Sequence, residues 1–394
     1  MLKIANDDVT KMYVGTSAVS KAYVETTQVW PNTPDYSSKY FTIEAIDSGT
    51  FKFSGNSVDY SVDNGQTWTT LPSNTNSPTV NAGSKILWKS TGLTPSSGAG
   101  IGTFSSTGRF NIEGNIMSLH YGDSFTGQTS LSGKDWAYKN MLSGATGLIS
   151  AENLVLPATT LAKGCYNTMF KRCTNLTTAP ALPATTLAQY CYQDLFADCS
   201  NLQAAPDLPA TTLASGCYYY MFEGCTSLQA APVLSATTMV VSCYAHMFEG
   251  CTGLTTAPVL PATTLATSCY EYMFKGCTSL TTAPDLPGGN IENSVYAHMF
   301  EGCTGITTAP VLSGSSLGRS SYNSMFSGCS SLNYIKMTAT DIDGVGCLTN
   351  WVAGVSATGH FVKATGVSLP SGASGIPTGW TVEADEEIAG VSNE

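Results

Sequence analysis

A 26-residue segment recurs seven times between Leu156 and Phe326, with the approximate form LPATTLAxxCYxxMFxGCTxLTTAPx. The second aromatic position of the segment is phenylalanine in every copy, at intervals of 26 residues: Phe170, Phe196, Phe222, Phe248, Phe274, Phe300 and Phe326. A repeat of this length is typical of a solenoid, in which each unit buries its apolar face only against its neighbours. The sequence therefore predicts one stacked structure with a continuous core.

The composition supports a folded chain and argues against nucleic acid as a partner. Hydrophobic residues make up 42% of the 394 positions and charged residues 11%, which provides ample material for a core. The net charge is −11, and only 17 lysines and arginines are scattered along the chain. Phosphate contacts need clustered basic side chains, so we expect no nucleic-acid partner.

We expect neither an export signal nor a membrane-spanning segment in this chain. The first residues, MLKIANDDVTKMYVG, lack a basic region followed by an apolar run, so we expect no secretory leader. Thr, Ser or Gly interrupts the apolar runs within a few residues, well short of the roughly 20 apolar residues that span a bilayer. We expect no membrane insertion and synthesis in the cytoplasm.

Cysteine occurs 13 times, and 12 of these residues occupy two repeat positions eight residues apart, as in Cys217 and Cys225. On a helical turn this spacing places both side chains on one face, which predicts buried, reduced thiols that pack as small hydrophobic groups. Disulfides between coils are the alternative, because equivalent residues of stacked coils lie close together. Zinc-binding spacings are absent, so we expect no metal and no cofactor.

Each unit reads as three pieces. LTTAP predicts a short β stretch ended by proline, LPATTLA a turn of the chain, and CYxxMFxGC a compact helical turn. Glycines such as Gly224 and Gly250 follow the apolar face, where a left-handed residue ends a helix. The tyrosine after the first cysteine, Tyr218 for example, is interpreted as structural. The repeats are therefore predicted to form an α/β solenoid.

A smaller duplication occupies the N-terminus, where VTKMYVGTSA from Val9 is echoed by VSKAYVETTQ from Val19. Each copy alternates like a short strand and then turns. Two hairpin-like units of this size are too short to be stable alone and need a partner surface. We predict a β anchor that oligomerises, and the residues expected to carry it are Lys11, Tyr13, Val14, Lys21, Tyr23, Val24 and Trp30.

Between these two repeats the chain is rich in short alternating runs such as YFTIEAI and KILWKS, which predict an Ig-like β-sandwich. Trp68 and Trp88 are expected to fill its interior, with sugar stacking as the alternative. The predicted organisation is a multi-domain chain: residues 1–30 anchor, 31–38 linker, 39–124 β-sandwich, 125–155 solenoid N-cap with a degenerate repeat, 156–335 repeats, 336–382 C-terminal cap and 383–394 acidic tail.

No constellation of residues indicates catalysis. The chain has four histidines, and no nucleophile elbow, zinc-protease, phosphate-loop or paired-carboxylate motif accompanies them. A hydrolase needs such a set. We therefore expect no enzymatic activity.

One surface pattern stands out from the repeats. The residue before the repeated methionine is Tyr220, His246, Tyr272 and His298 in four successive units, and Tyr219 lies beside the first of them. One interpretation is a solvated face on which rings stack. The other is a docking surface for a protein or a glycan, because aromatic side chains are enriched at interfaces. The partner-binding candidates are Tyr219, Tyr220, His246, Tyr272 and His298.

The motifs LPATTLA, CYxxMFxGC and LTTAP closely resemble the BspA-like leucine-rich repeat family of Bacteroidetes and their phages. The segment TNWVAGVSATGHFVK is similar to the end cap of that family. The resemblance covers about half of the chain and implies a leucine-rich-repeat solenoid that serves surface adhesion or recognition. It implies no catalytic residues.

The N-terminal decapeptides resemble a short motif on virion proteins of tailed phages, including crAss-like phages. Together with the β region and the solenoid, this resemblance implies a head or tail fibre or a capsid decoration located in the virion. Such a protein would form a homotrimer, contact other virion proteins through residues 1–30 and present the solenoid to a host-surface protein or glycan. The alternative is a bacterial cell-surface BspA-like adhesin.

Overall fold

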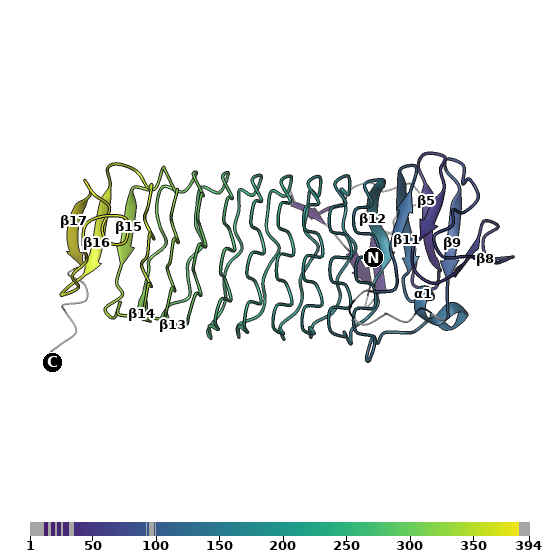
Figure 1. Ribbon diagram of the computed structural model, residues 1–394, viewed down its shortest axis with the longest axis horizontal. Coiled ribbons are helices and arrows are strands. Elements are labelled where there is room, and N and C mark those ends of the chain that lie inside the picture. The colour runs from purple at the N-terminus through teal and green to yellow at the C-terminus, as the bar shows by residue number, and fades with distance from the viewer. Residues whose placement is uncertain are drawn as a thin grey trace.

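The computed structural model describes residues 35–385, apart from residues 92, 94–97 and 99, and the backbone of four short strands nearer the N-terminus. Figure 1 shows an elongated molecule in which a β-rich region, a long row of stacked coils and a small terminal sheet follow one another. One hydrophobic cluster runs through all three, from Phe41 to Trp380. The coils therefore extend the core of the β-rich region.

The four N-terminal strands form two antiparallel pairs: β1 (Met12–Val14) with β2 (Ser17–Val19), and β3 (Ala22–Val24) with β4 (Thr27–Trp30). These pairs confirm the small N-terminal β units expected from the duplication. Among the predicted anchor residues, those within strands are Tyr13, Val14, Tyr23, Val24 and Trp30, whereas Lys11 and Lys21 lie outside the described residues.

The β-rich region is built on a sheet with strand order β12-β11-β5-β9-β7-β8. Its strands are β5 (Phe41–Ala45), β7 (Val58–Ser61), β8 (Thr69–Leu71), β9 (Lys85–Lys89), β11 (Phe110–Asn115) and β12 (Leu148–Val155). All neighbours are antiparallel except β11 and β12, which are parallel. Because β12 begins the stacked coils, the sheet passes directly into the solenoid.

A second, two-stranded sheet covers the first. It pairs β6 (Phe51–Phe53) with β10 (Phe104–Ser106), and the Phe104 ring lies 5.5 Å from Phe41 and 5.2 Å from Trp88 of the large sheet. The region thus has two β layers around an aromatic core. It differs from the expected Ig-like sandwich, whose sheets are antiparallel, because β11 pairs in parallel with β12 of the first coil.

Helical structure is sparse in the described part of the chain. It comprises the one-turn helix α1 (Ser118–Tyr121) and the 3-10 turn η1 (Gly122–Ser124), which follow β11. Neither is long or apolar enough to cross a membrane.

The helical turn predicted for CYxxMFxGC is wrong, because in the described repeats this segment is a run of tight turns. Every fourth residue has a positive φ; around Cys217 these are Gly216 (61°), Tyr220 (57°) and Gly224 (68°). A positive φ at the third residue marks a type II turn, and it prevents a helix from continuing. The glycines expected to end a helix are turn residues.

Along these turns, successive backbone N–H groups donate alternately to a carbonyl of their own coil and to one of the next coil. The Tyr219 N–H donates to the Gly216 carbonyl (3.2 Å) within its own coil. The next N–H, of Tyr220, donates to the Ala245 carbonyl of the following coil at 3.1 Å. The same alternation continues in the neighbouring coils, so the turn backbone is satisfied partly locally and partly by stacking.

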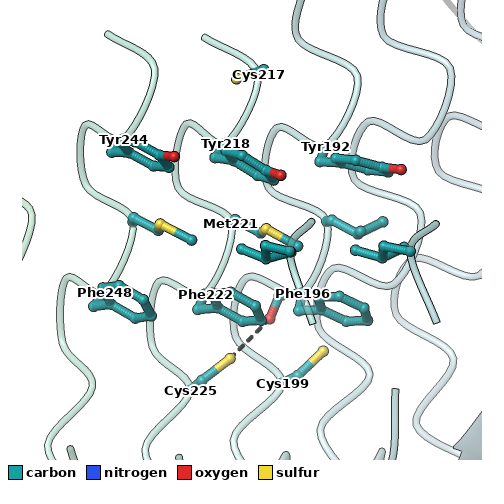
Figure 2. Close-up of a cluster of buried hydrophobic side chains, with 14 of the residues drawn as sticks. Tyr192, Phe196, Cys199, Cys217, Tyr218, Met221, Phe222, Cys225, Tyr244 and Phe248 are labelled. Atoms are coloured by element: carbon teal, nitrogen blue, oxygen red, sulfur yellow. Dashed lines mark hydrogen bonds between the residues drawn. The ribbon is translucent and has the colours of Figure 1, made fainter. Parts of the chain in front are cut away.

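The interior of the solenoid consists of columns of identical side chains (Figure 2). The Phe222 and Phe248 rings stack with centroids 5.7 Å apart and planes 4° apart, and Tyr218 stacks on Tyr244 at 5.5 Å. All four side chains are buried. The inward apolar positions and the structural role of the tyrosines are therefore confirmed.

The cysteines join the same interior. All 13 lie among the described residues, and they are buried and unbridged. From Cys199 onward, the thiols of the second column donate to the phenylalanine carbonyl of the preceding coil, as Cys251 Sγ does to Phe222 O (3.0 Å) and Cys277 Sγ to Phe248 O (3.1 Å). The predicted burial is confirmed, and these thiols also link adjacent coils.

Two further sheets lie towards the C-terminus. β13 (Gly289–Ile291) and β14 (Gly314–Leu317) pair between successive coils, and the parallel sheet of β15 (Tyr334–Met337), β16 (His360–Ala364) and β17 (Thr381–Asp385) follows the last repeat. The buried Trp351 ring lies between Phe326 of the last repeat (6.4 Å) and Phe361 of β16 (6.0 Å). These rings close the apolar column.

Candidate recognition surface

The residues of the aromatic row, Tyr220, His246, Tyr272 and His298, occupy the middle left-handed position of the turn run, with φ between 57° and 58°. A side chain in this conformation costs of order 1 to 3 kcal/mol. Four residues later the same coils have glycine at the next left-handed position, as at Gly224. At the row position itself, other coils carry the smaller residues Thr168, Asp194 and Ser324 in the same conformation, so the large rings are particular to these four coils.

The four rings stack on one another along the outside of the coils. Their centroids are 4.1 Å apart for Tyr220 and His246, 4.4 Å for His246 and Tyr272, and 4.2 Å for Tyr272 and His298. Tyr219 meets the row edge-on, 4.3 Å from Tyr220 and 5.3 Å from His246. All five partner-binding candidates therefore lie together, although their binding role stays a prediction.

A line of charged side chains accompanies the row. His246 Nδ1 donates to Glu249 Oε2 (2.5 Å), and His298 Nδ1 donates to Glu301 Oε2 (2.6 Å). Lys275 lies between the two carboxylates, 3.6 Å from Glu249 and 3.9 Å from Glu301, and 5.0 Å from the centre of the Tyr272 ring. The histidines are thus oriented by carboxylates that the sequence analysis did not connect with them.

Burial and charge act on this surface in opposite directions. Burial acts to raise the pKa of Glu249, but the hydrogen bond from His246 and the nearby Lys275 ammonium hold that pKa below its ordinary value. Burial, together with a contact to Tyr219, raises the pKa of Tyr220. Both groups therefore keep their ordinary charge states at neutral pH, with Glu249 ionised and Tyr220 neutral.

The geometry favours contact through ring edges. Both faces of His246 and of Tyr272 are covered by neighbouring rings, so neither can stack on a sugar. The side chain of His246 is 12% exposed and that of His298 24%. With Nδ1 donating to a carboxylate, Nε2 of each has no hydrogen-bond partner among the described residues. The surface can therefore offer polar edges, Tyr219 and alternating charges to a partner.

The repeats match a known family. A family model described as the BspA type leucine rich repeat region matches residues 149–281 and, in an overlapping match, residues 243–344. Residues 149–344 are BspA-type leucine-rich repeats. The matches begin at β12 and do not reach the duplicated N-terminal segment. A search of curated proteins found no match to this chain.

The BspA-type repeats place no catalytic set on the aromatic row. Thiols are the strongest nucleophiles in the repeats, and burial raises the pKa of Cys251 in the interior to about 12, which keeps its thiol protonated. No group of three side chains suited to a metal ion occurs among the described residues. The two remaining histidines lie apart, His120 buried beside Tyr138 (4.9 Å) and His360 in β16.

Sequence reasoning missed a second aromatic cluster, which joins the segment before the BspA-type repeats to their first coils. Lys139 Nζ lies 4.8 Å from the centre of the Trp136 ring, and Lys163 Nζ lies 5.9 Å from Trp136 and 6.0 Å from Tyr190. A side chain at Gly164 would collide with the Trp136 ring, which explains the glycine there. Trp136 falls outside the regular repeat, so the period gave no signal for it.

The two tryptophans of the β-rich region have different environments. Trp88 is fully buried between the layers, as predicted. The prediction for Trp68 is wrong: it lies just before β8, half-buried, 4.9 Å from the Tyr40 ring and with Lys89 Nζ 4.2 Å from its centre. The alternation pattern could not distinguish a strand residue from one in the preceding loop.

Proposed function

We propose that this protein recognises a partner macromolecule through its BspA-type repeats and catalyses no reaction, in the manner of a cell-surface adhesin. The observation that supports this proposal is the aromatic row, in which four large side chains occupy strained turn positions on the surface. Residues held in strained backbone conformations cluster at functional sites. The family match supports the same class of function.

The partner surface is inferred from the chemistry of the row. Tyrosine supplies a large, partly apolar contact, and tyrosine is enriched where proteins meet. Glu249, Lys275 and Glu301 alternate in sign, so a partner with the opposite alternation would be held in one register. We therefore propose a folded protein on a cell surface as the partner of the row.

The test uses substitutions that other coils of the chain already carry. Asn140 and Asn350 occupy left-handed turn positions with φ of 59° and 52°, so asparagine fits this conformation. A His246→Asn/Tyr272→Asn variant should keep its fold and lose at least tenfold in affinity for bacterial or epithelial cells, measured by flow cytometry with labelled protein. Ser324→Asn, at the same coil position beyond the row, is the matched control.

The outcomes separate the alternatives. Equal binding by the row variant and by the unaltered protein would mean that the rings of the row stack on one another but do not bind a partner. Absence of binding to either cell type would contradict the adhesin function. Protease treatment of the cells before binding tests the partner class, because a protein partner would be destroyed and a glycan partner would remain.

We propose a second candidate function on the basis of the duplicated N-terminal segment. Two antiparallel pairs of three or four residues per strand need a partner surface to be stable. In a trimer, residues 1–30 of the three copies would give one another this partner surface and would attach the trimer to other virion proteins. The chain would then be a fibre or a capsid decoration. Deletion of residues 1–30 should then abolish incorporation into particles, measured by mass spectrometry. An adhesin would keep its cell binding after the same deletion.

A further inference from the structure

A polar groove of about 900 Å³ crosses four adjacent coils of the BspA-type repeats, which is the scale of ligand-binding sites. Its lining includes Thr177, Asn201, Gln203, Thr226, Gln229 and Thr255. None of its lining residues is charged, and none belongs to the aromatic row. The groove is therefore a separate surface with a different chemistry.

The groove coincides with two coils that depart from the repeated sequence. Gln203 and Gln229 stand where the flanking coils have Thr177 and Thr255. At the following position these two coils carry alanine in place of the threonine found in their neighbours. A long amide beside a shortened side chain, twice in succession, gives the groove its central pair of polar groups.

The hydrogen bonds of the lining leave this central pair available. Thr177 Oγ1 donates to Ile149 O (3.0 Å), and Thr255 Oγ1 donates to Gln229 O (3.1 Å), so these hydroxyls are used within the fold. The side-chain amides of Gln203 and Gln229 are exposed and have no partner among the described residues. A primary amide offers two donors and one acceptor oxygen.

The backbone of the groove excludes strand addition by a peptide. Thr255 N–H donates to Gln229 O (2.9 Å), and Ala231 N–H donates to Thr256 O (3.3 Å), so the lining coils pair with each other. A peptide that adds as a strand needs a free sheet edge. An ionic ligand needs an opposite charge, which this lining does not offer. Uncharged hydroxyls that both donate and accept fit it best.

We propose that this groove binds a neutral glycan chain that lies along the axis of the coils, with its hydroxyls held by Gln203 and Gln229. Successive coils present equivalent groups about 5 Å apart, as neighbouring strands do. A linear glycan offers the same hydroxyl pattern at every sugar, so both partners are periodic. The site is independent of the aromatic row and of the function proposed for it.

The test measures binding of cellohexaose, mannohexaose, maltohexaose and xylohexaose to the full chain by isothermal titration calorimetry. At least one should bind, and Gln203→Thr/Gln229→Thr should weaken its binding about tenfold. That variant restores the residue that flanking coils carry, so its melting temperature should not change. Thr281→Ala, at the same coil position outside the groove, and Tyr272→Asn of the aromatic row should both bind as the unaltered protein does.

Three results would overturn the proposal. The first is absence of binding by all four hexasaccharides at millimolar concentration. The second is an unchanged affinity in Gln203→Thr/Gln229→Thr, which would place the glycan elsewhere. The third is tighter binding of a sulfated heparin hexasaccharide or of a neutral threonine-glycine peptide than of any neutral sugar. Unchanged cell binding by the row variant would refute the role proposed for the row and leave this site unaffected, so the two proposals fail separately.

Discussion

The buried phenylalanine column and the partly buried aromatic row at the surface both place one ring on each coil, yet they are held by different forces. In the column the centroids lie 5.3 to 5.7 Å apart, and every ring is buried. In the row they lie 4.1 to 4.4 Å apart on a left-handed backbone. Burial fixes the first arrangement, whereas direct contact between rings shapes the second.

The magnitudes explain why only the column governs stability. A buried phenylalanine contributes roughly 1.5 to 3 kcal/mol. A stacked pair on the surface contributes about 0.5 to 1.5 kcal/mol, which is offset by a backbone conformation that costs of order 1 to 3 kcal/mol. The row is thus close to neutral for the free energy of unfolding, which favours recognition as the reason for its side chains.

Alkaline pH should give the largest change in the free energy of unfolding, because it acts on buried thiols along the whole interior. Burial raises the thiol pKa of Cys173 and of Cys251 from the ordinary value of 9.0 to about 12. The unfolded chain therefore releases these protons at lower pH than the folded chain does. Stability should be complete below pH 9 and fall progressively towards pH 12. Urea unfolding with a reductant at pH 8 and pH 11 measures this, and identical midpoints would contradict it.

Phe248→Ala should be the most damaging single substitution in this set. The ring lies 5.7 Å from both Phe222 and Phe274 and is fully buried, so its removal leaves a cavity in the column. We expect a loss of about 3 to 5 kcal/mol in the free energy of unfolding, measured by urea unfolding followed by circular dichroism. A loss below about 1 kcal/mol would show that the column does not carry the stability of the coils.

Two buried tyrosines sharpen the comparison within the interior. The Tyr270 hydroxyl is buried without a partner among the described residues, whereas the Tyr296 hydroxyl donates to Pro287 O (2.6 Å). Tyr270→Phe should therefore stabilise the chain, and Tyr296→Phe should destabilise it, each by about 1 kcal/mol. Thermal unfolding of the two variants in parallel decides the point, and shifts of the same sign would count against it.

Tyr272→Asn should have the smallest effect on stability. It removes ring contacts to His246 and His298 but places a residue that tolerates the left-handed conformation there. We expect a change of less than about 1 kcal/mol in the free energy of unfolding, measured under the conditions used for Phe248→Ala. A loss as large as that of Phe248→Ala would mean that the row is a structural element.

The spacing of Phe222, Phe248 and their equivalents was sufficient to predict stacked coils and the residues inside them. It could not distinguish a helix from a run of turns, because Tyr218 and Phe222, four residues apart, face inward in both. The deciding property is the positive φ of Tyr220, a residue type that gives no warning of it. Gly224 fitted either interpretation.

For the candidate sites too, the sequence pattern predicted which residues are involved but not their three-dimensional surroundings. The repeat identified the members of the aromatic row, but the row's connection to Glu249 depends on how the turn directs each side chain. Gln203 and Gln229 were visible in the sequence as departures from threonine, and their significance depends on the groove around them. The parallel pairing of β11 with β12 joins segments whose alternation patterns resemble ordinary strands.

The alternating hydrogen bonds of the turns have a consequence for the length of the molecule. Each coil receives on one side the same array of donors and acceptors that it presents on the other, as the bond from Tyr220 N–H to Ala245 O and its equivalents show. An in-frame gain or loss of one 26-residue segment would leave every remaining coil with the same hydrogen-bond partners in the coil next to it. The length of the solenoid can thus change by whole coils, while the β-rich region at one end and the C-terminal sheet at the other stay unchanged.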